Sequence, residues 1–189
     1  GYGADASANI IATSPVEIQL ETSDIPPLAT TTFRFGANLD AGAAQPTSAT
    51  FNTADPTSYN NTTSGSVYDT LGNPHVLSYY FVKTPTAGQW NVYASVDDTA
   101  IGNVNLGNGA GNPLTLNFDS NGALTTTMPV NAALTIGGGA TSPIAFSLDM
   151  AGMTQFGSPF SVNSLFQDGY SSGRLVGLNI GSDGTIQGR

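Results

Sequence analysis

The sequence has no cysteine, and this absence excludes disulfide bonds, thiol nucleophiles and thiolate metal sites. Basic residues are scarce as well: four lysines and arginines stand against thirteen acidic residues, for a net charge of −9. Nucleic-acid binding needs clustered lysine and arginine to neutralise phosphates, so we expect no nucleic acid as a partner. The apolar runs are much shorter than the roughly 20 residues that span a bilayer, so we expect no membrane partner either.

Glycine and proline are abundant, with 23 and 11 positions among 189 residues. Glycine weakens helices and proline removes a hydrogen-bond donor, so long helices are not expected. Only 9% of the residues are charged, against roughly 25% in an average soluble domain. Because β-branched and aromatic residues are plentiful, this composition indicates an ordered β protein rather than a disordered chain.

Alternation of apolar and polar residues predicts a series of short strands. In residues 15–21, Val16, Ile18 and Leu20 face one side and the polar residues between them face the other. Similar patterns, bounded by turn residues, predict strands at 30–39, 66–69, 75–82, 90–96, 114–118, 124–127, 130–136, 144–150, 175–180 and 185–187, the last two as a hairpin.

The segments between these strands have a different character. Residues 40–62 and 97–113 are irregular and rich in glycine, proline, threonine and asparagine, so we interpret them as loops. Residues 153–168 predict a short turn or helical piece around 163–167. The turn before residue 75 contains Gly72, for which we expect a positive φ. Composition changes near residues 40 and 151, which we interpret as borders between two domains.

Catalytic chemistry has few candidates. The single histidine, His75, would need a nucleophile and an orienting acid, and Ser66 and Asp69 are near it in sequence alone. The alternative, a histidine at a strand edge beside a turn, is favoured. A glycosidase needs two opposed carboxylates; Asp97-Asp98 and Asp119 fall in predicted loops, where we expect ordinary pKa values. We therefore expect no enzyme and no catalytic residues.

Cofactor and metal sites are not expected either. Asp119 to Gly122 and Ser182 to Gly184 lack the alternating oxygen ligands of a calcium loop and are typical of hairpin turns. Gly137 to Gly139 lacks the lysine and strand-to-helix context of a phosphate loop. The predicted site residues are none for catalysis, none for cofactors and none for metals.

An aromatic group along two predicted strands is the one candidate for ligand binding. Strand alternation puts some of its members in the core, so at most two or three can be exposed together. An exposed platform would favour an extracellular adhesin or carbohydrate-binding β module, which is our alternative function. The group consists of Tyr79, Tyr80, Phe81, Trp90 and Tyr93.

Four stretches of the sequence resemble the bacterial flagellar hook protein family. The most specific are Val67 to His75, continuing through Tyr80 to Thr84 and Trp90 to Tyr93, and Gln167 to Leu175 with Asp183 to Arg189. The others are Ala29 to Thr32 with Asn38 to Asp40, and Phe118 to Leu124. They cover most of the chain in the order in which the family has them. A related axial protein of the rod or junction remains a second alternative, which the block at 67–93 disfavours.

The resemblance implies an all-β chain of two β-rich domains, one inserted into the other, with β-hairpins and long loops rich in Gly, Pro, Asn and Thr. Residues 1–40 and 152–189 would form an inner domain, and 41–151 the inserted outer domain. The family's helical terminal segments, which drive polymerisation, are not in this sequence. We therefore expect a fragment that is monomeric by itself, consistent with a first residue other than Met and an end at Arg189.

The function that the resemblance implies is structural. The subunit would form the hook of the bacterial flagellum, a universal joint above the basal body that transmits motor torque to the filament. Its expected partners are other copies of itself in a helical homopolymer, the hook cap and the hook–filament junction proteins. Its expected location is extracellular, after export through the flagellar secretion apparatus without a cleaved signal peptide. No cofactor is implied.

Overall fold

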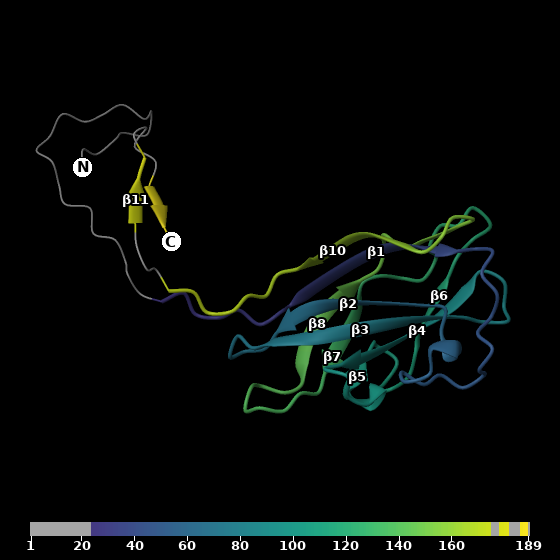
Figure 1. Cartoon of the computed structure of the whole chain (residues 1–189), viewed down its shortest axis with the longest axis horizontal. Helices are drawn as coiled ribbons and strands as arrows, with labels where there is room; N and C mark the ends of the chain where they lie inside the picture. Colours follow the sequence, from purple (N-terminus) through teal and green to yellow (C-terminus); the bar gives the residue numbers. More distant parts are fainter. Residues whose placement is uncertain (1–23, 175–177, 182–185, 189) are drawn as a thin grey trace, which may run out of the picture. The chain divides into compact units, whose positions relative to one another are not determined.

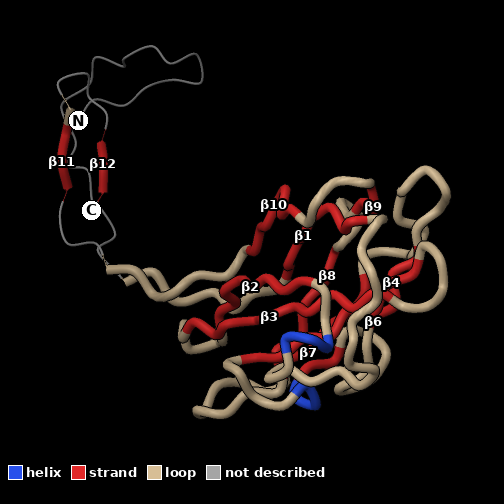
Figure 2. The backbone as a smooth tube through the Cα atoms, turned by 45° about the vertical axis from the view of Figure 1, so that its right-hand side comes forward, coloured by secondary structure: helices blue, strands red, loops and turns tan. Residues whose placement is uncertain are grey.

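A computed structural model describes residues 24–174, 178–181 and 186–188. These fall into two compact units: one runs from Pro26 to Ser172, and the other takes in both ends of the chain, up to Ile25 and from Gly173. Strands dominate the first unit, and its helical content is two short 3₁₀ turns, η1 (Pro56–Ser58) and η2 (Ile101–Asn103) (Figures 1 and 2).

The strands follow one another with short turns or long loops between them. They are β1 (Thr32–Asp40), β2 (Asn61–Tyr68), β3 (Pro74–Lys83), β4 (Gln89–Val96), β5 (Val104–Asn105), β6 (Leu114–Asn117), β7 (Val130–Leu134), β8 (Ile144–Asp149), β9 (Thr154–Phe156), β10 (Ser161–Gln167), β11 (Leu178–Ile180) and β12 (Ile186–Gly188).

Two sheets make up the unit from Pro26 to Ser172. The first has the order β10-β1-β8-β7-β5, with β9 also paired to β1, and the second has the order β2-β3-β4-β6. In the first sheet β1 lies between β10, to which it is antiparallel, and β8, to which it is parallel. The second sheet begins as an antiparallel meander of β2, β3 and β4, and these strands contain most of the residues predicted as strands at 66–69, 75–82 and 90–96.

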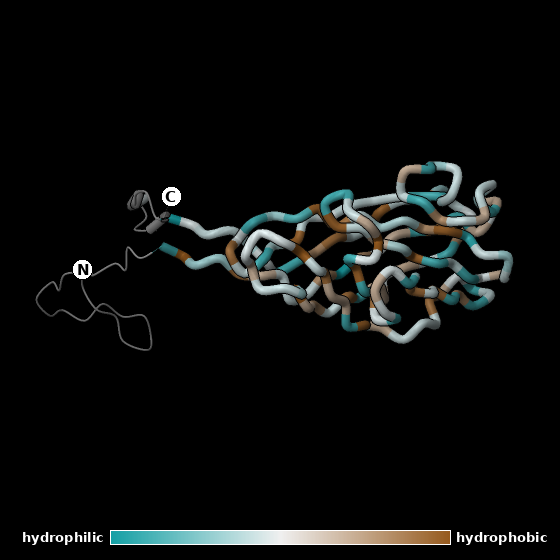
Figure 3. Tube along the Cα trace, turned by 90° about the horizontal axis from the view of Figure 1, so that it is seen from below, coloured by the Kyte–Doolittle hydropathy of each residue, from teal (hydrophilic) through white to brown (hydrophobic). Residues whose placement is uncertain are grey.

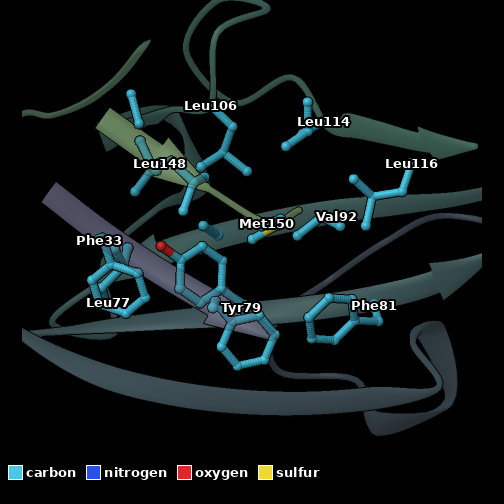
Figure 4. Packing of buried hydrophobic residues seen from close by; sticks show 14 of the residues in the cluster. Phe33, Leu77, Tyr79, Phe81, Val92, Leu106, Leu114, Leu116, Leu148 and Met150 are labelled. Atoms are coloured by element: carbon cyan, nitrogen blue, oxygen red, sulfur yellow. The ribbon is translucent and has the colours of Figure 1, made fainter. Parts of the chain in front are cut away.

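One hydrophobic core joins the two sheets. On β1 the alternate residues Phe33 and Phe35 are buried, and on β3 so are Tyr79 and Phe81. The ring centroids lie 5.7 Å apart for Phe33 and Tyr79, and 5.9 Å apart for Phe35 and Phe81. Figure 4 shows side chains from both sheets converging on this interior, and Figure 3 shows apolar and polar residues interspersed along the trace of the unit. The predicted all-β class is confirmed.

Three secondary-structure predictions are wrong. Residues 97–113, expected as a loop, contain η2 and β5, because Val104 and Asn105 pair with β7 at the edge of the first sheet. Residues 163–167 form part of β10 rather than a helical piece, because they pair with β1 from Phe33 to Gly36. Most of β10 is exposed, so it carries no clear period-2 alternation that would mark a strand. Residues 124–127 form no strand; only a single bridge joins Leu124 to Phe118.

The ends of the chain test fewer predictions. The strand expected at 15–21 lies outside the described residues. The final hairpin is present in the part of the chain that the structure describes: β11 and β12 are antiparallel, with Ile180 opposite Ile186. The turn expected between them falls on residues that are not described.

The two compact units divide the chain differently from the predicted domains. The expected borders at residues 40 and 151 would assign β1, β9 and β10 to the inner domain. In the structure β1 shares the core of the outer strands and pairs with β8, with Phe33 opposite Leu148. The compact unit therefore extends to Pro26 on one side and Ser172 on the other.

These divisions predict different behaviour for two expressed segments. We expect residues 26–172 to unfold cooperatively on heating, and residues 41–151 to give no cooperative transition, because the shorter segment lacks β1 and exposes the aromatic rings that β1 covers. Circular dichroism melting and the dispersion of amide signals in NMR spectra are the measurements. A cooperative transition of residues 41–151 would uphold the borders at 40 and 151.

Candidate functional site

His75, the one histidine of the sequence, lies between two carboxylates. Its Nδ1 is 2.6 Å from Asp97 Oδ2, and its Nε2 is 3.3 Å from Asp69 Oδ2. Burial lowers the pKa of His75, but the hydrogen bonds and negative charges of Asp97 and Asp69 outweigh it, so the pKa is raised above 6.5. The cluster ties the start of β3 to the end of β4, since Asp97 Oδ1 also accepts from the Val76 N–H at 2.8 Å.

Asp69 organises the turn before His75. Its Oδ1 accepts hydrogen bonds from the backbone N–H groups of Leu71 and Asn73, both at 2.8 Å. Burial raises the pKa of Asp69, but the hydrogen bonds from Asn73, His75 and Leu71 outweigh burial and lower it to about 2. Gly72 completes the turn with φ +83°, as predicted from the sequence.

This cluster has no geometry for nucleophilic catalysis. A serine nucleophile needs its hydroxyl on an imidazole nitrogen, yet both nitrogens of His75 face carboxylates. Ser66 is exposed on β2, where it pairs with Val76 and makes no hydrogen bond to His75. Among the described residues no group of histidine and carboxylate side chains is arranged to hold a metal ion.

The other candidate carboxylates serve turns. Asp97 and Asp98 both have positive φ, at 49° and 55°, where β4 ends. Asp119 accepts hydrogen bonds from the N–H groups of Asn121 and Ala123, both at 2.9 Å. Hydrogen bonds from Ala123 and Asn121 lower the pKa of Asp119, which corrects the expectation of an ordinary value: solvent exposure does not cancel bonds made by the turn itself.

The aromatic group divides between the two faces of the second sheet. Tyr79, Phe81 and Trp90 lie in the core, and Tyr80 and Tyr93 point to the other face. There the loop before β2 covers them: Phe51 stacks on Tyr93 with centroids 4.1 Å apart. The stacked rings occupy each other's faces, so the described residues of this group form no free platform for a sugar ring.

A hollow of about 240 Å³ lies beside the stacked pair. Lys83, the only lysine of the sequence, lines it and holds the loop: its Nζ donates to the carbonyl oxygens of Ala41 and Ala43 at 2.6 and 2.7 Å. The ammonium also lies 5.8 Å from the centroid of the Trp90 ring. These contacts use Lys83 to fasten the loop to the sheet, which is a structural role.

The densest set of long-range polar contacts lies where the chain enters and leaves the compact unit. Asp168 accepts hydrogen bonds from the N–H groups of Thr31 and Thr32, at 2.8 and 2.9 Å, and from the Thr31 hydroxyl. Burial raises the pKa of Asp168, but these hydrogen bonds outweigh it and lower the pKa. Thr30 also exchanges hydrogen bonds with Tyr68, its N–H donating at 2.9 Å and its hydroxyl accepting at 2.9 Å.

We call Thr30, Thr31, Tyr68 and Asp168 the entry clasp. Beyond it, Leu28 and Tyr170 exchange two backbone hydrogen bonds at 3.0 and 2.9 Å, so the incoming and outgoing segments of this unit run antiparallel (Figure 1). Sequence reasoning missed these residues as a site. Three of the four stretches that resemble hook proteins contain residues of the entry clasp, and this was the one hint in the sequence. The sequence does not show that these stretches lie close together, because their contacts join residues more than 100 positions apart.

A second feature that sequence reasoning missed is the apolar surface of β10. Val162, Leu165 and Phe166 are exposed by 43, 42 and 53%. Other large apolar side chains of the described residues are exposed to a similar extent, among them Leu28, Tyr170 and Phe156. Among the described residues no helix is long and apolar enough to cross a bilayer.

Comparisons with known proteins show which family the sequence matches. Residues 38–170 match the family described as the flagellar basal body protein FlaE D2 domain. The chain is 32% identical over 193 aligned residues to the flagellar hook protein FlgE of Escherichia coli strain K12 and equally to that of Salmonella typhimurium. In both alignments all of this chain and 46% of the relative are covered, so the chain spans about half the length of these relatives.

A solved structure is also similar, the flagellar hook protein FlgE2 of Helicobacter pylori. It has 17% sequence identity and a TM-score of 0.40, and the match covers 68% of this chain and 31% of that one. No comparison supports an adhesin or a carbohydrate-binding module.

The His75 cluster predicts a pH dependence of stability. Because the folded-state pKa is raised, protonated His75 stabilises the fold fully below pH about 6.5, and this contribution is lost as the pH rises through the folded pKa. We expect the melting temperature of His75→Gln to fall furthest below that of the unmodified chain near pH 6, and the difference to shrink towards pH 9. Asp69 stays ionised throughout this range. Parallel melting curves from pH 5.5 to 9 would contradict the assignment.

The geometry of the turn before β3 predicts that a side chain at Gly72 would destabilise the fold. A Cβ there would lie 2.7 Å from Pro27 Cβ, and valine disfavours a positive φ. We expect Gly72→Val to lower the free energy of unfolding by about 2 kcal/mol or more, measured by urea denaturation. Gly137→Val is the matched control, because a Cβ at Gly137 meets nothing within 4 Å and no positive φ is involved. Equal midpoints for the two variants would show that the turn tolerates the strain.

Proposed function

The chain belongs to the family of the flagellar basal body protein FlaE D2 domain, and from this membership we propose that it is the folded, outer part of a flagellar hook subunit with a mechanical function. The observation that carries the proposal is that the family match and one compact unit of the structure take in the same strands, β2 to β10. The family match at residues 38–170 falls inside the single compact unit from Pro26 to Ser172.

The arrangement of the unit's ends supports an inserted domain. An insertion into another domain needs its two ends close together, and Leu28 and Tyr170 are hydrogen-bonded neighbours. We propose that the rest of the subunit supplies an inner domain built from both ends of the chain. The expected borders at 40 and 151 move outward in this proposal, to the ends of the compact unit.

A universal joint needs subunits that keep their shape while their contacts re-form during each rotation. A continuous core of aromatic and aliphatic side chains from both sheets supplies the first property. Loops rich in threonine, asparagine, serine and glycine supply the second, because wet polar contacts exchange partners without a large desolvation step. The net charge of −9 makes association of subunits sensitive to salt.

Catalysis is not part of the proposed function. The chemistry-bearing residues of the described chain are used in its structure: both nitrogens of His75 face carboxylates that also bind backbone N–H groups. Asp168 likewise holds two strands together. These uses support a protein whose polar groups maintain a shape.

The proposed partners are further copies of the subunit in a helical homopolymer, with the hook cap during assembly and the junction proteins at the filament end. The proposed location is the hook outside the cell, reached through the flagellar secretion apparatus without a cleaved signal peptide. The names of the relatives, flagellar hook proteins in E. coli and S. typhimurium, support this assignment.

Immunogold electron microscopy tests the proposal on intact flagellated cells of the source organism. With antibodies raised against residues 26–172, we expect gold on the short curved segment between the cell surface and the filament. A strain in which the gene is deleted is the control and should show no gold. Gold along the filament or over the cell wall would reject a hook subunit and favour a filament protein or an adhesin.

A further inference from the structure

The two sheets leave a seam on one side of the unit, between β10 and β2. These are the outermost strands of their sheets, and neither pairs with the other in the described chain. They approach closely at one point, where a Cβ built on Gly65 of β2 would lie 3.1 Å from Leu165 Cδ1 of β10. The seam is therefore a place where two sheet edges are adjacent and have no further strand beside them.

Apolar side chains are exposed along this seam for a geometric reason. Leu165 and Val162 lie opposite Phe35 and Ala37 of β1, so they point to the core side of their sheet. Nevertheless both are more than 40% exposed. The facing part of β2 carries small or polar residues, Asn61 to Ser66, whose side chains do not cover them.

The opposite face of β10 is also apolar at its end. Phe166 is 53% exposed and pairs with Arg34 of β1, whose guanidinium carbon lies 5.8 Å from the ring centroid. Exposed edge strands usually carry charges or proline, which discourage pairing with another chain. Residues Ser161–Gln167 contain neither a charge nor a proline. The pairing of β10 with β1 has one bulge, opposite Gly36 and Ala37, and this is the only feature of the strand that would discourage pairing with another chain.

The charge around the seam indicates what can bind there. The chain carries thirteen acidic and four basic residues, so copies of it repel one another over most approaches. Residues 157–167 and 59–68, which form the seam, contain no charged residue. Arg34 lies beside them, over the Phe166 ring, and the carboxylates that directly follow the two segments, Asp69 and Asp168, accept hydrogen bonds from backbone N–H groups of this chain. A second acidic copy therefore meets little repulsion from the two strands of this seam, and Arg34 is a favourable charge beside them.

We propose that the exposed edge of β10, with Val162 and Leu165 on the side of the seam and Phe166 and Arg34 on its other face, is a docking surface for a second copy of this subunit. The inference rests on the proposed function as a hook subunit and assigns part of the subunit–subunit contact to a particular strand. Burial of three half-exposed apolar side chains provides the attraction, and the free edge of β10 provides backbone hydrogen-bonding groups.

Cysteine labelling in the full-length subunit tests the proposal, since this part of the chain has no cysteine of its own. Ser164→Cys places a thiol on β10, and Ser120→Cys places one on an exposed turn as the matched control. We expect a maleimide to label Ser164→Cys at least tenfold more slowly in assembled hooks than in dissociated subunits, with less than a twofold change for Ser120→Cys. Equal labelling of Ser164→Cys in both states, or equal protection of both thiols, would overturn the docking surface.

A pair of leucine substitutions gives an independent readout. Leu165 and Leu71 are both roughly half exposed, but Leu71 lies in the turn before β3. We expect Leu165→Asn to reduce the yield of assembled hooks at least tenfold although the subunit stays folded, as a cooperative melting transition would show, and Leu71→Asn to assemble normally. Normal assembly of Leu165→Asn would count against the seam. Failure of the unmodified subunit to form hooks would instead count against the proposed function.

Discussion

The packing of β1 against β3 is the interaction on which the rest of the unit depends. β1 is an interior strand of its own sheet, between β10 and β8, and its inward side chains Phe33 and Phe35 contact Tyr79 and Phe81 of the other sheet. Burying each such aromatic side chain contributes on the order of 1.5–3 kcal/mol. Because no other described strand joins three strands of one sheet to the core of the other, the unit is organised around β1.

The position of β1 also explains the entry clasp. A central strand that comes first in the unit fixes where the chain enters, and β10, antiparallel to it, returns the chain to the same place. The backbone groups at the start of β1 then need partners, and Asp168 accepts two of them. Gly169 fits only because it has no side chain: a Cβ there would lie 2.8 Å from the backbone nitrogen of Thr30.

The alternation of apolar and polar residues was sufficient to predict those strands that have one face buried in the core and the other exposed to solvent. The alternation in 90–96 predicts β4, and the buried side chains are Trp90 and Val92 with the next alternate residues. β10 could not be predicted in this way, because residues on both of its faces are exposed and the alternation is lost. The entry clasp was inaccessible for another reason: Thr31 and Asp168 are 137 positions apart, and only the fold brings them together.

The same contrast between interior and exterior bears on mechanics. Deforming the core would open contacts between close-packed rings, which costs several kcal/mol for each large side chain, whereas rearranging polar loop contacts exchanges one set of hydrogen bonds for another at small net cost. In the proposed hook, a bending tube of such subunits would therefore concentrate its strain at the contacts between them. An edge such as β10, with a few apolar side chains on a largely polar exterior, suits the proposed role, because burying only a few half-exposed side chains would contribute a small attraction beside exchangeable polar contacts.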